Sequence, residues 1–188
     1  MALPRVLVFY GTANGQTRKI ASAVAETLWS SRIEVDVVNA QEPLDPTPLD
    51  YAAVIVAAPV RAGQYPKAVR RWVTSHADEL RRRPAAFVSV CLGVLEHNPK
   101  TDAVLEGILQ RFFEQTGWRP ATVKIVAGAL PYTQYNWLTR WMMRRIVARA
   151  HGDVDTSRDY EYTDWQDLRE FAAEFAHRLK DSPAKIAS

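Results

Sequence analysis

Cysteine is almost absent from this sequence. Cys91 is the only one in 188 residues, so no disulfide can form within the chain, and such usage suits a reducing compartment. Long apolar runs are also missing, because the longest, residues 52–60, is far too short to cross a bilayer. The four histidines lack the spacing of metal ligands. We therefore expect neither a disulfide scaffold, nor a membrane-spanning protein, nor a metal centre.

The sequence also lacks the features that separate domains. No linker rich in proline, glycine or serine divides the chain, and no repeat or low-complexity tract is visible. A chain of 188 residues is long enough for one well-packed α/β domain, so we expect a single domain over residues 1–188. Because residues 1–5 lead directly into an apolar run, we expect no signal peptide.

Apolar runs typical of strands alternate with helical periodicity along the chain. Five runs predict strands, at residues 6–9, 32–39, 53–58, 86–90 and 123–127. Helices are predicted between and after them, from apolar stripes such as Ile20, Val24 and Leu28. Further stripes cover residues 69–80 and 104–113, and Thr163-x-x-Gln166 has the pattern of a capping box before the last helix. This alternation predicts a doubly wound parallel sheet with right-handed crossovers.

A short polar turn, Tyr10-Gly11-Thr12-Ala13-Asn14-Gly15-Gln16-Thr17, separates the first strand from the first helix. Backbone N–H groups at a helix N-terminus can bind an anion without a lysine, and glycines let the backbone approach a ligand closely. The turn matches neither G-x-x-x-x-G-K-[ST] nor G-x-G-x-x-G, so neither a triphosphate nor a dinucleotide site is indicated. It resembles the flavodoxin phosphate loop, T-x-T-G-x-T, with Asn14 in place of the middle threonine. The alternative is an ordinary β–α turn with threonine capping.

The fold class predicted from these features is a flavodoxin-like, doubly wound, five-stranded parallel sheet with strand order 2-1-3-4-5. Ligands of such sheets bind beyond the carboxyl ends of the strands, where the loops after strands one, three and four meet. The resemblance to flavodoxins implies that these loops bind FMN. The predicted cofactor-binding residues are Thr12, Ala13, Asn14, Gly15, Gln16, Thr17, Pro59, Val60, Arg61, Gly63, Tyr65, Ser89, Val90, Cys91, Leu92 and Gly93.

Two residues after the third strand are candidates for a catalytic role. Tyr65 is the only aromatic residue of these ring-bordering loops that can stack on a flavin; the alternative is a hydrophobic staple for the next helix. Arg61 can stabilise an anionic reduced ring or bind a substrate carboxylate; the alternative is a surface arginine paired with an acid. Cys91 has no evident base partner, so we expect a packed small residue rather than a nucleophile.

Much of the basic charge lies after the fifth strand. The net charge is only +3, although the pI is near 9.1, and residues 131–150 combine tyrosine, tryptophan and arginine with no acidic residue. A helix here can rest in a membrane interface, or its arginines and indoles can bind a large, flat anionic substrate. The alternative is a packed helix with a solvated basic face. We expect no nucleic-acid partner, because the basic cluster is short and belongs to no known reader motif. The candidate contacts are Trp137, Arg140, Trp141, Arg144 and Arg145.

Motifs along nearly the whole chain resemble the flavodoxin-fold, menaquinone-dependent protoporphyrinogen IX dehydrogenases. They are Gly15-Gln16-Thr17-Arg18-x-Ile20-Ala21, Arg61-x-Gly63-x-Tyr65, Trp118-Arg119-Pro120, Ala127-Gly128-Ala129-Leu130, Gly152-x-x-Asp155-Thr156 and Tyr162-Thr163-Asp164-Trp165. The discriminating feature is the helical basic and aromatic insertion after strand five, residues 131–160, since short electron-carrying flavodoxins lack it.

This resemblance implies a haem-biosynthesis enzyme that uses FMN to oxidise protoporphyrinogen IX to protoporphyrin IX and passes electrons to a membrane quinone. It also implies a cytoplasmic protein associated peripherally with the anionic inner face of the cytoplasmic membrane. Two other functions stay open. One is a flavodoxin-like FMN electron carrier or an FMN-dependent quinone reductase with another substrate; the other is a flavin-free membrane-binding module.

Overall fold

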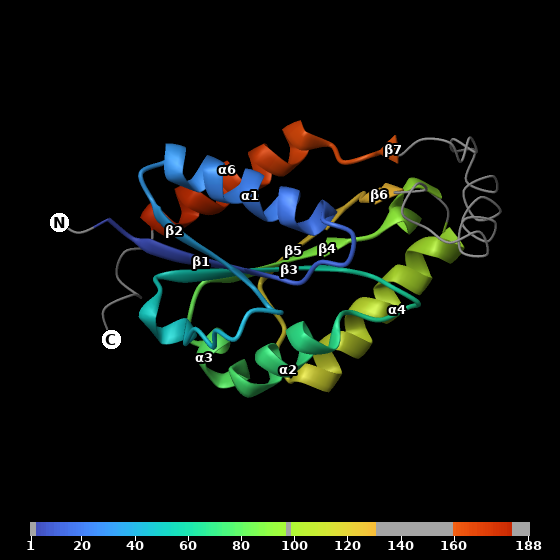
Figure 1. The fold of residues 1–188 in the computed structure, drawn as a ribbon, viewed down its shortest axis with the longest axis horizontal. Coiled ribbons are helices and arrows are strands. Elements are labelled where there is room, and N and C mark those ends of the chain that lie inside the picture. Colours follow the sequence, from blue (N-terminus) through green and yellow to red (C-terminus); the bar gives the residue numbers. More distant parts are fainter. Residues whose placement is uncertain (1–2, 97–98, 131–159, 182–188) are drawn as a thin grey trace.

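The computed structural model describes residues 3–96, 99–130 and 160–181 (Figure 1). Its centre is a parallel sheet of five strands in the order β2-β1-β3-β4-β5, so the predicted fold class is confirmed. The strands coincide closely with the predicted runs: β1 (Arg5–Tyr10), β2 (Glu34–Asn39), β3 (Ala53–Pro59), β4 (Ala85–Val90) and β5 (Thr122–Val126).

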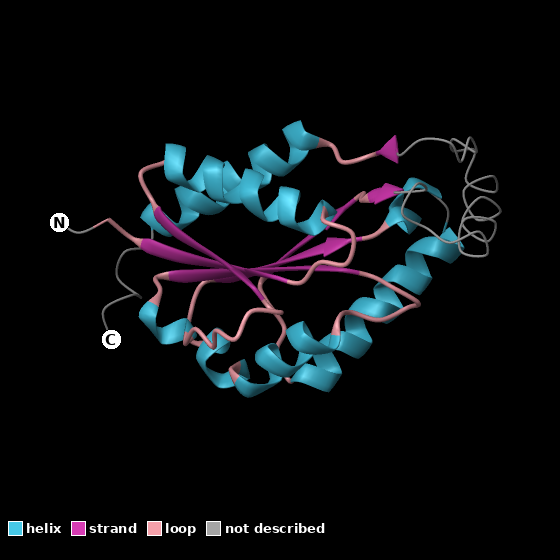
Figure 2. Ribbon diagram, viewed as in Figure 1, coloured by secondary structure: helices cyan, strands magenta, loops and turns pink. Residues whose placement is uncertain are grey.

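Helices cover both faces of this sheet (Figure 2). One layer contains α1 (Gln16–Ser30) and α6 (Trp165–Asp181); the other contains α2 (Lys67–Ser75), α3 (Ala77–Arg81) and α4 (Pro99–Thr116). Side chains of a strand alternate between faces, so Val6 and Val8 of β1 pack under the first layer, and Leu7 and Phe9 under the second. Burial on both faces explains why the central strands are continuous apolar runs.

The predicted helix over residues 69–80 is two helices in the structure. The chain leaves helical geometry at His76 (φ −112°, ψ 16°), which lies between α2 and α3. The apolar residues Val69, Trp72 and Leu80 on either side of the break all pack into the same core. Because the apolar stripe runs across the break without interruption, its periodicity could not reveal the break.

A second, two-stranded sheet was not predicted. β6 (Ala129–Leu130) and β7 (Tyr160–Glu161) pair antiparallel, with Leu130 opposite Tyr160, so both ends of the segment 131–159 meet at this pair. The predicted basic and aromatic helix, with its candidate contacts, falls within that segment and lies outside the described residues. No helix in the described part of the chain is long and apolar enough to cross a membrane.

The capping box predicted at Thr163 is wrong. The residue that caps α6 is Asp164, whose Oδ1 accepts hydrogen bonds from the N–H groups of Gln166 and Asp167, both at 3.0 Å. The Thr163 hydroxyl instead donates to the carbonyl of Ala127 at 2.8 Å. Thr163 therefore matches the capping pattern in sequence, but the next residue, Asp164, is the cap. The Thr163 side chain instead bonds to a residue distant in the sequence.

Replacement of the observed cap should destabilise the fold. Asp164→Ala leaves two N–H groups of the first turn of α6 without their acceptor, and we expect the free energy of unfolding to fall by about 1 kcal/mol. Asp164→Asn is the matched control, because asparagine caps about equally well. Urea denaturation of both variants measures the difference; equal stability of the alanine variant and wild type would contradict the assignment.

Candidate functional site

The loops that follow β1, β3 and β4 meet at the carboxyl edge of the sheet, where the predicted site lies. The first is the predicted phosphate loop (residues 10–17). It leaves the sheet at Gly11, whose N–H donates to the carbonyl of Ala57 of β3 at 2.9 Å. A Cβ at Gly11 would lie only 2.6 Å from Cγ2 of Val69. Glycine at this position therefore allows the close approach of the loop to α2.

The end of the phosphate loop forms the start of α1. Gly15 has φ +84°, a conformation that glycine adopts without strain, and its N–H donates to Oγ1 of Thr12 at 3.0 Å. The N–H groups of its first turn, at residues 16–18, have no intrahelical acceptor because no helical carbonyl precedes them, and no side chain caps the helix. The Thr12 hydroxyl still has its own proton to donate. This set of neutral donors at a helix N-terminus fits a phosphate monoester.

Gln16 contributes to this loop through its main chain. Its side-chain amide donates to Oγ1 of Thr163 at 2.9 Å, so the amide is committed to another part of the fold. Thr17 is almost fully buried, whereas Thr12 and Asn14 are half-buried at the surface of the turn. The structure thus brings the main-chain N–H groups of the predicted residues together. The Gln16 side chain bonds to Thr163 and not to the loop.

The loop after β3 contains a tight turn. Arg61 and Gln64 exchange two backbone hydrogen bonds of 2.8 and 3.0 Å, and the residues between them, Ala62 and Gly63, have φ values of 46° and 73°. Positive φ at both central positions defines a type I′ turn, which is strained for alanine. The turn presents Arg61 as an exposed side chain beside the half-buried Pro59 and Val60.

Tyr65 lies in the core behind this turn. Its ring is 3% exposed and packs edge-on against Phe87 and Phe112, with centroids 5.1 and 4.8 Å away. Its hydroxyl and Oγ of Ser89 share a hydrogen bond of 2.7 Å. Burial raises the pKa of the Tyr65 hydroxyl above its ordinary value, so this group stays protonated near neutral pH. This burial favours a packing role for Tyr65 over direct stacking on a flavin.

Main-chain hydrogen bonds tie the end of β4 and the loop after it to the neighbouring strands. Ser89 and Val90 are buried strand residues, and Cys91, Leu92 and Gly93 are half-buried. The N–H of Cys91 donates to Val126 at 2.9 Å, and the N–H of Val60 donates to Val90 at 2.9 Å, so β4 links the loops on its two sides. These bonds fix the walls of the site relative to one another.

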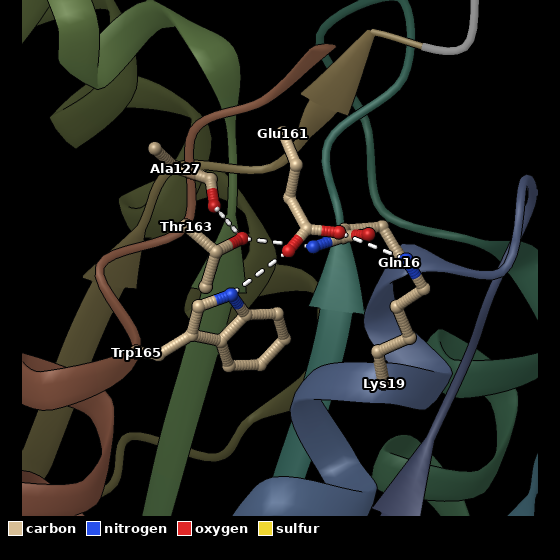
Figure 3. A network of polar contacts seen from close by, with 6 residues as sticks. All are labelled: Gln16, Lys19, Ala127, Glu161, Thr163 and Trp165. Atoms are coloured by element: carbon tan, nitrogen blue, oxygen red, sulfur yellow. Dashed lines mark hydrogen bonds and ion pairs between the residues drawn. The ribbon is translucent and has the colours of Figure 1, made fainter. Parts of the chain in front are cut away.

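A polar network beside the phosphate loop was missed by the sequence analysis (Figure 3). Lys19 of α1 forms an ion pair with Glu161 of β7 at 2.8 Å, and Trp165 donates to the same carboxylate at 2.8 Å. Together with the Gln16–Thr163 bond, these contacts connect α1 to β7 and the start of α6. The sequence does show the Tyr162-Thr163-Asp164-Trp165 motif, but nothing local indicates its distant partners.

The Tyr65–Ser89 bond gives a testable prediction about the walls of the site. Tyr65→Phe or Ser89→Ala leaves one buried hydroxyl unpaired, and we expect each variant to lose about 1–2 kcal/mol of unfolding free energy. The double variant removes both hydroxyls, so its loss should be clearly smaller than the sum of the single losses. Chemical denaturation of the four proteins measures this coupling; additive losses would show that the two hydroxyls do not interact.

Comparison with known proteins agrees with this geometry. The family described as "Flavodoxin domain" matches residues 7–157. The oxidised flavodoxin 1 of Bacillus cereus superposes with a TM-score of 0.56 at 16% identity, over 92% of this chain and 97% of that one. The rubredoxin oxygen:oxidoreductase of Desulfovibrio gigas gives 0.55 at 15% identity, over all of this chain and 38% of that one. A flavodoxin domain indicates a flavin cofactor, which the phosphate loop fits.

Relatives with higher identity share one name. Protoporphyrinogen IX dehydrogenase [quinone] of Escherichia coli (strain K12) is 35% identical over 179 residues, which is 95% of this chain and 98% of that protein. The protein of the same name from Leishmania major is 32% identical, over 92% of this chain and 75% of its own length. The resemblance predicted from the motifs is thus confirmed, and the chain belongs to the flavodoxin-domain family of quinone-linked protoporphyrinogen IX dehydrogenases.

Proposed function

We propose that this chain is an FMN-dependent enzyme that oxidises protoporphyrinogen IX to protoporphyrin IX and passes the electrons to a membrane quinone. The observation that carries the proposal is the similarity to dehydrogenases of that name over 95% of the chain. That similarity includes the segment between β6 and β7, which is where a short flavodoxin and this chain would differ. An electron carrier would share the fold, but it has no need of this segment.

FMN fits the phosphate loop better than a dinucleotide. The loop offers one helix N-terminus with Thr12 and main-chain N–H groups around it, which suits a single terminal phosphate. The sequence lacks the G-x-G-x-x-G turn that receives a pyrophosphate. When bound, the flavin supplies the redox chemistry of both half-reactions. The chain itself supplies binding, orientation and exclusion of side reactions.

The loops after β3 and β4 would border the flavin ring. Residues 59–64 contribute the strained type I′ turn and the exposed Arg61, and residues 91–93 would contribute backbone. A cation at this place can stabilise negative charge on a reduced ring or pair with a substrate propionate. Tyr65 acts indirectly in this proposal, because its bond to Ser89 ties the end of the turn to β4.

Substrate or membrane contact is proposed for Trp137, Arg140, Trp141, Arg144 and Arg145, which lie outside the described residues. Their charge and aromatic character suit the propionates and the plane of a tetrapyrrole, or an anionic lipid surface. The β6–β7 pair supports a place near the flavin for these residues. Residues 131–159 begin and end at this pair, and the Lys19–Glu161 ion pair joins it to α1. Peripheral attachment to a membrane would bring the site to the quinone.

An assay with purified protein tests this function. Flavin-loaded protein, mixed with protoporphyrinogen IX and menaquinone without oxygen, should form protoporphyrin IX with stoichiometric reduction of the quinone. A flavin-containing protein that reduces partner proteins but does not oxidise porphyrinogen would be an electron carrier. A colourless protein with no affinity for FMN would be neither an FMN-dependent dehydrogenase nor a flavodoxin-like electron carrier.

Deletion of residues 131–150 separates cofactor binding from turnover. We expect the shortened protein to retain FMN, because the phosphate loop and both ring-bordering loops are intact, but to lose porphyrinogen oxidation. The flavin absorption spectrum is the control for a folded site. Full turnover in the shortened protein would show that the basic and aromatic segment has no part in the reaction.

A further inference from the structure

A set of side chains joins the first turn of α1 to β7 and the start of α6, and we call it the α1–β7 clamp: Gln16, Lys19, Glu161, Thr163 and Trp165 (Figure 3). We propose that this clamp couples ligand binding at the phosphate loop to the rigidity of the β6–β7 pair. It would thereby fix both ends of residues 131–159 when the cofactor is bound. The inference rests on the proposed function, in which those residues meet substrate or membrane.

Thr163 is the buried centre of the clamp. Its hydroxyl donates to Ala127, one residue beyond β5, at 2.8 Å and accepts the amide of Gln16 at 2.9 Å. The residue is 8% exposed, so both bonds are made away from water, where an unpaired partner is costly. One hydroxyl thus joins the end of β5, the first residue of α1 and the approach to α6.

Glu161 extends the clamp towards the surface. One carboxylate oxygen pairs with Nζ of Lys19 at 2.8 Å, and the other accepts from Nε1 of Trp165 at 2.8 Å. The hydrogen bond from Lys19 is the main cause that lowers the pKa of Glu161, so the carboxylate is ionised at neutral pH. An ion pair exposed to this extent contributes little by itself, so the buried Thr163 bonds carry most of the coupling.

Gln16 belongs both to the phosphate loop and to the α1–β7 clamp. Its N–H belongs to the unpaired donors of the phosphate loop, while its side chain donates to Thr163. A ligand that fixes the first turn of α1 therefore also fixes the Gln16 amide that donates to the Thr163 hydroxyl. By linkage, a Gln16 side chain held by Thr163 also favours binding of the ligand. The β6–β7 pair has only two residues in each strand, too few to be stable without such support.

Hydrogen exchange with and without FMN tests the coupling. The reporter is the amide of Tyr162, which donates to Gly128 beside β6. In the wild type, saturating FMN should slow its exchange about fivefold or more, the range of typical coupling between sites. Thr163→Val removes both bonds of the hydroxyl while keeping the shape of the side chain, and should reduce the effect of FMN to below about twofold. Thr163→Ser keeps the hydroxyl and should behave as the wild type.

Two further variants exclude a general loosening of the fold. Asp167→Asn breaks the ion pair of Lys124 with Asp167, which joins α6 to β5 without touching α1, and should leave the FMN effect unchanged. Glu161→Gln changes the clamp at a more exposed position and should give a smaller loss than Thr163→Val. The coupling is overturned if FMN does not slow the exchange of Tyr162 in the wild type, or slows it equally in Thr163→Val.

Steady-state kinetics then connects the clamp to the reaction. In Thr163→Val we expect KM for porphyrinogen to rise about fivefold while kcat stays within about twofold, because binding must now order the β6–β7 pair. An unchanged KM would show that the clamp does not affect binding of the porphyrinogen. The exchange experiment needs no turnover, so a chain that couples but does not oxidise porphyrinogen would refute the proposed function and leave the clamp confirmed.

Discussion

The site depends on the fixed position of the α1 N-terminus at the edge of the sheet. Ile20 and Leu28 of α1 are fully buried against the strands, and burial of each such side chain contributes about 1.5–3 kcal/mol. Gly11, bonded to β3 and packed against α2, sets where the chain turns into the helix. The body of α1 is therefore held in place, and its first turn presents the unpaired N–H groups at the edge of the sheet. An anion site made of main-chain donors depends on this placement, because the distances from the N–H groups to the anion determine how strongly they bind it.

The sheet and the phosphate loop were predictable because their signals are local in the sequence. Continuous apolar runs determine central strands, and the spacing of threonine, asparagine and glycine around Gly15 determines the turn. The strand order followed from these two features, since a phosphate-binding turn after the first strand fits a switch point beside it. Main-chain geometry, rather than any particular side chain, was what the sequence described well.

The rest of the site depends on contacts between residues distant in the sequence. Thr163 gave a capping pattern, yet its hydroxyl bonds to residues 36 and 147 positions away. Tyr65 was a candidate for stacking, but Phe87 and Phe112 from other elements surround its ring. The break at His76 and the two-residue strands β6 and β7 are too short to create a periodicity. In each case the local sequence allows several partners or element ends, and tertiary packing selects among them.

The antiparallel pairing of Leu130 with Tyr160 has a consequence for how such proteins can diversify. Because the two anchor residues are neighbours, a connection between them costs closure entropy that rises only by about 0.6 kcal/mol for each doubling of its length. The doubly wound scaffold can therefore tolerate connections of very different size and chemistry at this place. Under the proposed function, a replacement of this one segment would change the contacts to substrate and leave the loops after β1, β3 and β4 as they are.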